Sequence, residues 1–108
     1  MKKLPYRART TSGDVFDIEF PLHNETGDAV RVGQLVSKVL DALDKDIALA
    51  GETSNGDVLQ AMAMVLAIRA RMIHAPRTLT ESLSIDLVRT ALDAVASSVH
   101  QDPKIGHA

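Results

Sequence analysis

Four cationic or titratable side chains fall within one nine-residue stretch: Arg69, Arg71, His74 and Arg77. Guanidinium groups bind phosphate and carboxylate oxygens through paired hydrogen bonds, so this cluster is the best candidate for a site that binds a small anionic ligand. A structural interpretation competes with it, because cations at the C-terminal end of a helix are stabilised by the helix dipole. No glycine-rich phosphate loop precedes a helix nearby.

Arg69 is the most informative member of this cluster, because a helical wheel places it within the apolar arc of its expected helix. A buried guanidinium must be paired. The structural interpretation is therefore that Arg69 lies near the helix end, extends its guanidinium to solvent, or meets a carboxylate such as Asp46 or Asp86. A partner in the same chain favours a structural role. An unpaired guanidinium that faces a cavity favours a ligand.

The histidines predict no metal site. His23, His74, His100 and His107 show no spacing of the HxxxH type, and the ordinary interpretation is a loop histidine, a helix-end histidine and two tail residues. We therefore expect neither a metal nor another cofactor.

Catalytic motifs are also missing. Ser12–Asp14 and Asn55–Asp57 match turn and cap chemistry rather than a nucleophile elbow or a nucleotide loop. Asp41, Asp44 and Asp46 are close in sequence but lie mostly on a solvated helix face, whereas acid–base catalysis needs carboxylates that converge in a pocket. We predict no catalytic residue, and a protein without enzymatic activity is the simpler interpretation.

Composition narrows the class of protein further. The 108 residues fit one domain, and 12 basic against 14 acidic residues give a net charge of −2. This balance argues against a nucleic-acid binder, and Glu81 and Asp86 would stand at the front of any recognition helix. The chain has no cysteine, which excludes disulfides and thiol catalysis.

The most apolar segment, residues 58–73, is interrupted only by Gln60, Arg69 and Arg71. It is too short and too charged to span a bilayer, and the basic first residues lead into no long apolar run of a signal peptide. We expect a soluble cytoplasmic protein without a membrane segment.

Apolar and polar residues alternate over residues 5–21, around a break that contains Gly13. Period two with such a break predicts a β-hairpin. The predicted register, with a three-residue loop, pairs Tyr6 with Phe20 on the apolar face and Arg7 with Glu19 on the charged face.

Helical spacing of apolar residues follows the hairpin. Residues 29–32 fit either a short third strand or the first turn of a helix with Asp28 as its N-cap. Gly51 is a natural helix end, and Ser54 with Asp57 resembles a capping box. The prediction is a helix-dominant α+β fold: a hairpin packed on three helices at about 34–50, 55–74 and 79–99, with a flexible tail at 100–108.

Two of these helices carry more apolar surface than a surface helix needs. An apolar stripe of about 100° suffices for docking on a core, whereas the second and third helices exceed it. The excess predicts a homodimer; the alternative is a compact monomer that covers both helices itself. The expected interface residues are Met62, Met64, Ile85, Val88, Leu92 and Val99.

Three functional hypotheses follow. The leading one is a small interaction or structural protein that self-associates through the second and third helices. The alternative is a binding protein, or an enzyme, for a small anionic ligand at the arginine cluster. A third is an adaptor that binds an unidentified protein through the hairpin edge or the tail, since edge strands accept further strands.

Overall fold

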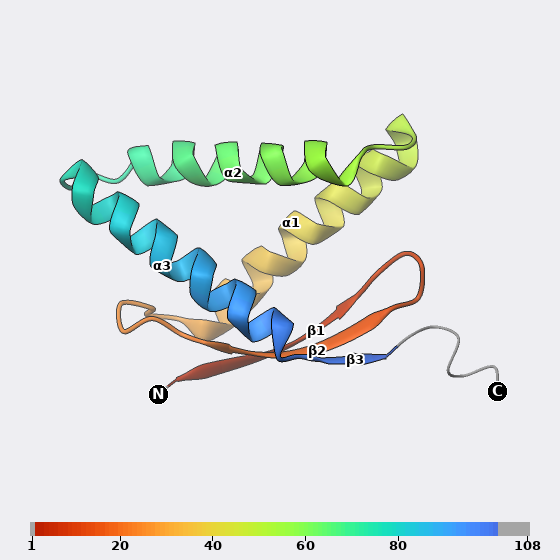
Figure 1. Cartoon of the computed structure of the whole chain (residues 1–108), viewed down its shortest axis with the longest axis horizontal. Helices are drawn as coiled ribbons and strands as arrows, with labels where there is room; N and C mark the ends of the chain where they lie inside the picture. The colour runs from red at the N-terminus through yellow and green to blue at the C-terminus, as the bar shows by residue number, and fades with distance from the viewer. Residues whose placement is uncertain (1, 102–108) are drawn as a thin grey trace.

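The computed structural model describes residues 2–101 and shows a helix-dominant α+β fold (Figure 1). Three helices lie on one side of a three-stranded antiparallel sheet with strand order β1-β2-β3. The predicted hairpin and three helices are confirmed. Their bounds are β1 (Lys3–Arg9), β2 (Val15–Pro21), α1 (Ala29–Ala50), α2 (Asn55–Arg71), α3 (Arg77–Ala96) and β3 (Val99–Gln101).

The hairpin pairs Tyr6 with Ile18 and Arg7 with Asp17, so the predicted register is wrong by two residues. The reason is the position of the loop, which spans residues 10–14 and is centred on Ser12, whereas the predicted loop, Ser12–Asp14, is centred on Gly13. The Thr10 amide donates to the Asp14 carbonyl at 2.9 Å, and Gly13 supplies a φ of 93° that other residues rarely adopt. A slip of two keeps each side chain on its face, so the predicted faces are confirmed.

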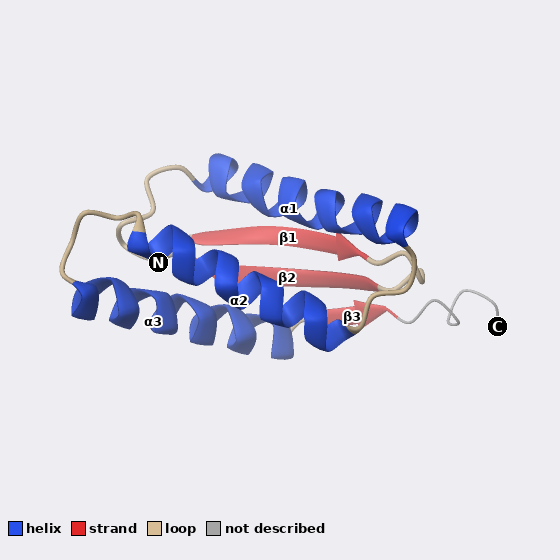
Figure 2. Ribbon diagram, turned by 90° about the horizontal axis from the view of Figure 1, so that it is seen from above, coloured by secondary structure: helices blue, strands red, loops and turns tan. Residues whose placement is uncertain are grey.

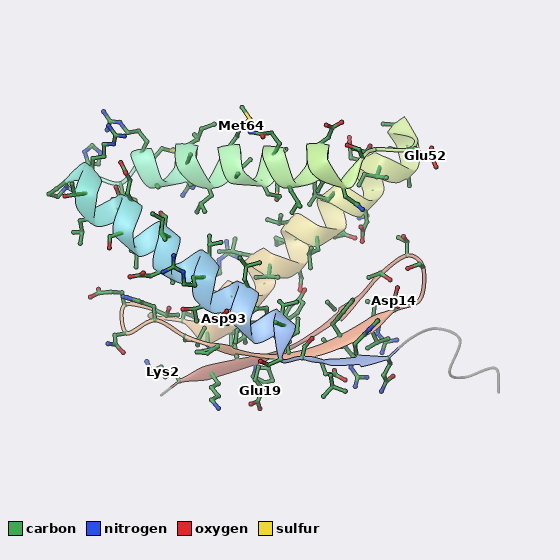
Figure 3. The ribbon with its side chains drawn as sticks, viewed as in Figure 1. Lys2, Asp14, Glu19, Glu52, Met64 and Asp93 are labelled. Carbon is green, nitrogen blue, oxygen red and sulfur yellow. The ribbon has the colours of Figure 1, made fainter. Side chains whose placement is uncertain are left out.

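The two faces of the sheet differ in chemistry. Ile18, which is 6% exposed, lies on the face that the helices cover. The opposite face carries the ion pair of Arg7 with Asp17, whose two hydrogen bonds measure 2.6 and 3.0 Å. Glu19 also points away from the helices (Figure 3). Only the inner face of the sheet is therefore available to build a core.

The third strand comes from the C-terminal part of the chain. Val99–Gln101 pairs with Val15–Asp17, where the sequence predicts the end of the third helix at 99 and the start of the tail at 100; the helix ends earlier, at Ala96. Residues 102–108 lie outside the described residues. The alternative strand at 29–32 is instead the first turn of α1. Asp28 is its N-cap, with its carboxylate accepting from the Arg31 amide at 3.1 Å, which satisfies an otherwise free helix donor.

The helices meet the sheet unequally. Helix α1 approaches β1 through Gly33, which lies against Leu4, and through a 2.8 Å hydrogen bond between the Tyr6 and Ser37 hydroxyls. Helix α3 packs on β2. Helix α2 bridges the far ends of α1 and α3 and stands away from the sheet (Figure 1). The three helices therefore form an arch rather than a closed layer.

The ends of α2 show how local chemistry sets the corners of this arch. Gly51, with φ 97°, ends α1 and donates to the Ile47 carbonyl at 2.9 Å. The Ser54 hydroxyl caps α2 by accepting from the Asp57 amide at 3.1 Å. Helix α3 begins directly after Pro76, and no side chain caps its first turn.

Little of the described chain is buried. Among residues 2–101 only Ile18, which is 6% exposed, and Thr80, which is 8% exposed, are buried. The radius of gyration is 15.6 Å, against about 13 Å for a compact domain of this length. An aliphatic-rich chain has thus folded into an open frame.

The Ser54 cap provides a test of this local structure. Ser54→Ala should lower the free energy of unfolding by about 1 kcal/mol, because the Asp57 amide loses its acceptor. Ser82→Ala, an exposed position within α3, is the matched control and should be neutral or slightly stabilising. Urea titration at a fixed protein concentration measures both, and equal effects would contradict the capping role.

Candidate functional site

The arginine cluster lies at the corner between α2 and α3, and its members are exposed. Arg69 Nη1 donates only to the Met72 sulfur, at 3.6 Å, and no carboxylate lies within 4 Å of it among residues 2–101. Of the predicted alternatives, Arg69 therefore does not pair with a carboxylate; it lies in the last turn of α2 with its guanidinium exposed. Its side of α2 does face inward, but the chain leaves that side uncovered, so the guanidinium stays in solvent.

The other members do not complete an anion site. Arg77 pairs with Glu81 one turn along α3, so part of its charge is already neutralised. Arg71 and His74 are exposed. None of the four residues lines the hollow between α2 and α3 or the hollow above the sheet. The corner offers positive charge without an enclosure that excludes water.

A second polar cluster, not predicted from the sequence, joins the hairpin loop to β3. His100 Nε2 lies 2.9 Å from Asp14 Oδ1, and the Ser12 hydroxyl donates to Asp14 Oδ2 at 2.9 Å. The imidazole also stacks on the Phe16 ring, with centroids 4.4 Å apart and planes 5° from parallel. These contacts hold three residues of β3 against the hairpin.

The order of this cluster excludes serine-type nucleophilic catalysis. A catalytic serine must bond to the histidine that takes its proton, whereas here Asp14 stands between Ser12 and His100. Within residues 2–101, no three side chains of the kinds that ligate metals come together. The cluster therefore holds β3 against the hairpin loop. Hydrogen bonds from His100 and then Ser12 hold the pKa of Asp14 below its ordinary value.

The widest uncovered features are apolar, beginning with α1. Helix α1 contacts the sheet through Ser37. Leu35 and Val39 lie two residues before and after Ser37, so each is about 160° from it around the helix. Leu35 is 47% exposed, and no residue of α1 is buried. The strongly amphipathic α1 thus turns part of its apolar stripe away from its own sheet.

Helix α2 also leaves apolar side chains uncovered, on its inner side, which faces the sheet. Met64 points away from the sheet (Figure 3), so Met62 and Leu66, about 160° from it, face inward. Leu59, on the same inner side, is 70% exposed. Leu59 remains in solvent because α3 is the element on which α2 chiefly packs, and little else of the same chain lies beneath α2.

Helix α3 presents two apolar faces. Leu87 and Ala91 turn toward the space between α1 and α3, whereas Ile85 and Leu92 lie about 140–160° around the helix from Leu87. Ile85, Val88 and Leu92 form an exposed stripe, with Leu92 65% exposed. They share a shallow hollow of about 320 Å³ with Leu66 of α2.

The predicted interface residues are thus only partly brought together. Ile85, Val88 and Leu92 form one surface beside α2. Met62 is half-buried on the inner side of α2, and Met64 points outward. Val99 pairs opposite Asp17 on the outer face of the sheet, so it cannot share a surface with the α3 stripe.

A larger hollow of about 630 Å³ lies between α1 and α3 and above the sheet. Leu4 and Phe20 come from the sheet, Val32 and Val36 from α1, and Leu87 and Ala91 from α3. We call this space the trough. Seen from above, β1 and β2 are visible between α1 and α3, and α2 passes diagonally over them (Figure 2).

A scan against protein-family models returns no match, and searches of curated proteins and of solved structures return none either. Among residues 2–101, no helix combines the length and apolar character needed to cross a bilayer. The uncovered apolar surfaces are therefore the features of this chain that point to a function.

The Asp14–His100 contact predicts a specific pH dependence. A carboxyl with a lowered pKa in the folded state contributes stability above its unfolded pKa and loses it as pH falls through the folded pKa. The loss of stability in Asp14→Asn should be largest near neutral pH and should shrink below the ordinary aspartate value of 3.8. Urea titrations across this range, with Asp44→Asn as a surface control, measure it. A difference that stays constant with pH would contradict the assignment.

The arginine corner can be tested with inorganic phosphate. Because its side chains are exposed and not enclosed, phosphate should raise Tm equally in the wild type and in Arg69→Met, through the general exclusion of this salt from protein surfaces. A saturable rise specific to phosphate and absent from Arg69→Met would instead establish the anion site, since binding to the native state stabilises it by mass action.

Proposed function

We propose that this chain is a small non-enzymatic interaction protein that works as a homodimer, with α2 and α3 at the interface. The observation that carries the proposal is the exposure of Leu59 on the inner side of α2, together with the exposed stripe of Ile85, Val88 and Leu92 on α3. Surfaces that point inward or run as a continuous helical stripe, yet lie in water, are typical of one half of an assembly.

The exposed area is of the size that a permanent dimer buries. A compact monomer of this mass exposes about 5,800 Å², whereas this chain exposes 8736 Å², an excess of about 2,900 Å². Obligate interfaces bury at least about 1,000 Å² on each partner. Half of the excess would already satisfy that requirement.

A second copy is the partner that these surfaces fit best. Both copies carry the same aliphatic stripes, so the surfaces are complementary in chemistry without any further component, and a two-fold axis pairs each with its equivalent. The net charge of −2 gives two copies little reason to repel each other. Apolar burial at about 25 cal/mol per Å² then drives association.

The matched pair Val88 and Val30 tests the interface. Val88 lies in the α3 stripe, whereas Val30 is an exposed valine of the first turn of α1, about 140° around that helix from its apolar stripe. Val88→Asp should raise the dimer dissociation constant at least about 100-fold, because an unpaired charge would be buried. Val30→Asp should leave it unchanged.

Sedimentation equilibrium measures the dissociation constant, and Tm should rise with wild-type protein concentration because association stabilises the native state. A wild-type chain that sediments as a monomer at micromolar concentration, with Tm independent of concentration, would overturn the proposal. Equal effects of the two substitutions on the dissociation constant would show that the interface does not lie on α3.

A further inference from the structure

Helix α2 is built to be covered on all sides. Between Val58 and Ile73 only Gln60, Arg69 and Arg71 are polar, and an all-round apolar helix belongs in the centre of a structure. Its own chain covers only the part of it that packs on α3. The remaining cover must come from another chain, and it must reach the inner side as well as the outer side.

The trough offers such a helix an apolar surface. Residues of the sheet, of the first half of α1 and of the middle of α3 line it together with the loop that follows β2, and its volume is about 630 Å³. Helix α2 stands above the sheet between the ends of α1 and α3 (Figures 1 and 2). Leu35 and Val39 lie on the uncovered side of α1. Nothing among the described residues of the same chain fills the trough.

From these two observations we infer that the dimer is clasped: helix α2 of each copy lies in the trough of the other, beneath the partner's arch. This inference depends on the proposed homodimer. The two α2 helices then pack on each other through their inner sides, with Leu59, Met62 and Leu66 at the contact. The two sheets form the outer layers, and four helices surround the central pair.

The composition of α2 fits this position better than a dimer formed by contact between the outer sides of two α2 helices. Ala61, Ala63 and Ala67 are small enough to allow close approach of a second helix and of the sheet. On the outer side, Asp57 and Arg71 lie in the first and last turns, where their charges can reach solvent. An outer-side contact would leave the inner leucines and the trough exposed.

The absence of cysteine from the sequence makes the arrangement testable by disulfide formation. In the clasped dimer, Met64 on the outer side of α2 faces the partner's trough, which Leu87 lines. A tagged Met64→Cys chain and an untagged Leu87→Cys chain are refolded together from denaturant and oxidised. We expect a mixed disulfide dimer, resolved from the homodimers by the mass of the tag. Val30→Cys, on the outside of α1, is the control and should give no mixed disulfide with Leu87→Cys.

The outcomes separate the clasp from self-association itself. Met64→Cys chains joined only to each other would show outer-side contact between α2 helices and would overturn the clasp while preserving the dimer. A dimer by sedimentation without any mixed disulfide would do the same. A monomeric wild-type chain would overturn both. If Leu87→Cys does not fold, Ala91→Cys on the same wall takes its place.

Subunit exchange gives a second measurement that needs no substitution. Two clasped arches cannot separate without opening the fold, so folded tagged and untagged copies should exchange no faster than the dimer unfolds, and mixed dimers should form readily only after unfolding and refolding. Exchange much faster than unfolding, both measured under the same conditions, would overturn the clasp and leave a side-by-side dimer.

Discussion

The position of α2 is the constraint on which the rest of the structure depends. Between Val58 and Ile68 its only polar residue is Gln60, yet it spans the ends of α1 and α3 at a distance from the sheet. A helix of that composition is stable in water only when other protein covers it. The open frame, the trough and the exposed stripes of α1 and α3 all follow from holding this helix away from its own sheet.

Local features of the fold could be predicted from the sequence because their causes are local. The Gly51 helix end and the Ser54 cap depend on residues within one turn, and the hairpin faces depend on alternation. The register depends on loop geometry, which the residues Thr10–Asp14 do not reveal by type alone. Strand β3 has only three residues, too few to show periodicity, and it is fastened by His100 to a residue 86 positions away.

The candidate site likewise combines features that local sequence predicts with features that depend on distant parts of the chain. The helical wheel correctly predicts that Ile85, Val88 and Leu92 share a face, because that follows from 3.6 residues per turn. The helical wheel also gives the side of α2 on which Arg69 lies. It does not show what covers that side, and in this structure little of the chain covers it. Val99 fails to join the stripe because α3 ends at Ala96 and the chain becomes a strand, whose side chains follow a different period.

The edges of the sheet favour the helices as the route to assembly. Hydrogen bonds run from the Leu22 amide to the Lys2 carbonyl and from the Thr10 amide to the Asp14 carbonyl. The backbone N–H and C=O groups of the even-numbered residues of β1 therefore point toward β2. Pro5 therefore faces the free edge, where it offers no donor to a further strand. With that edge blunted and the outer face charged, the apolar surface of the helices remains as the attractive one. In the proposed dimer this surface is also the core, so that association completes the fold of each chain, and stability and assembly become one equilibrium.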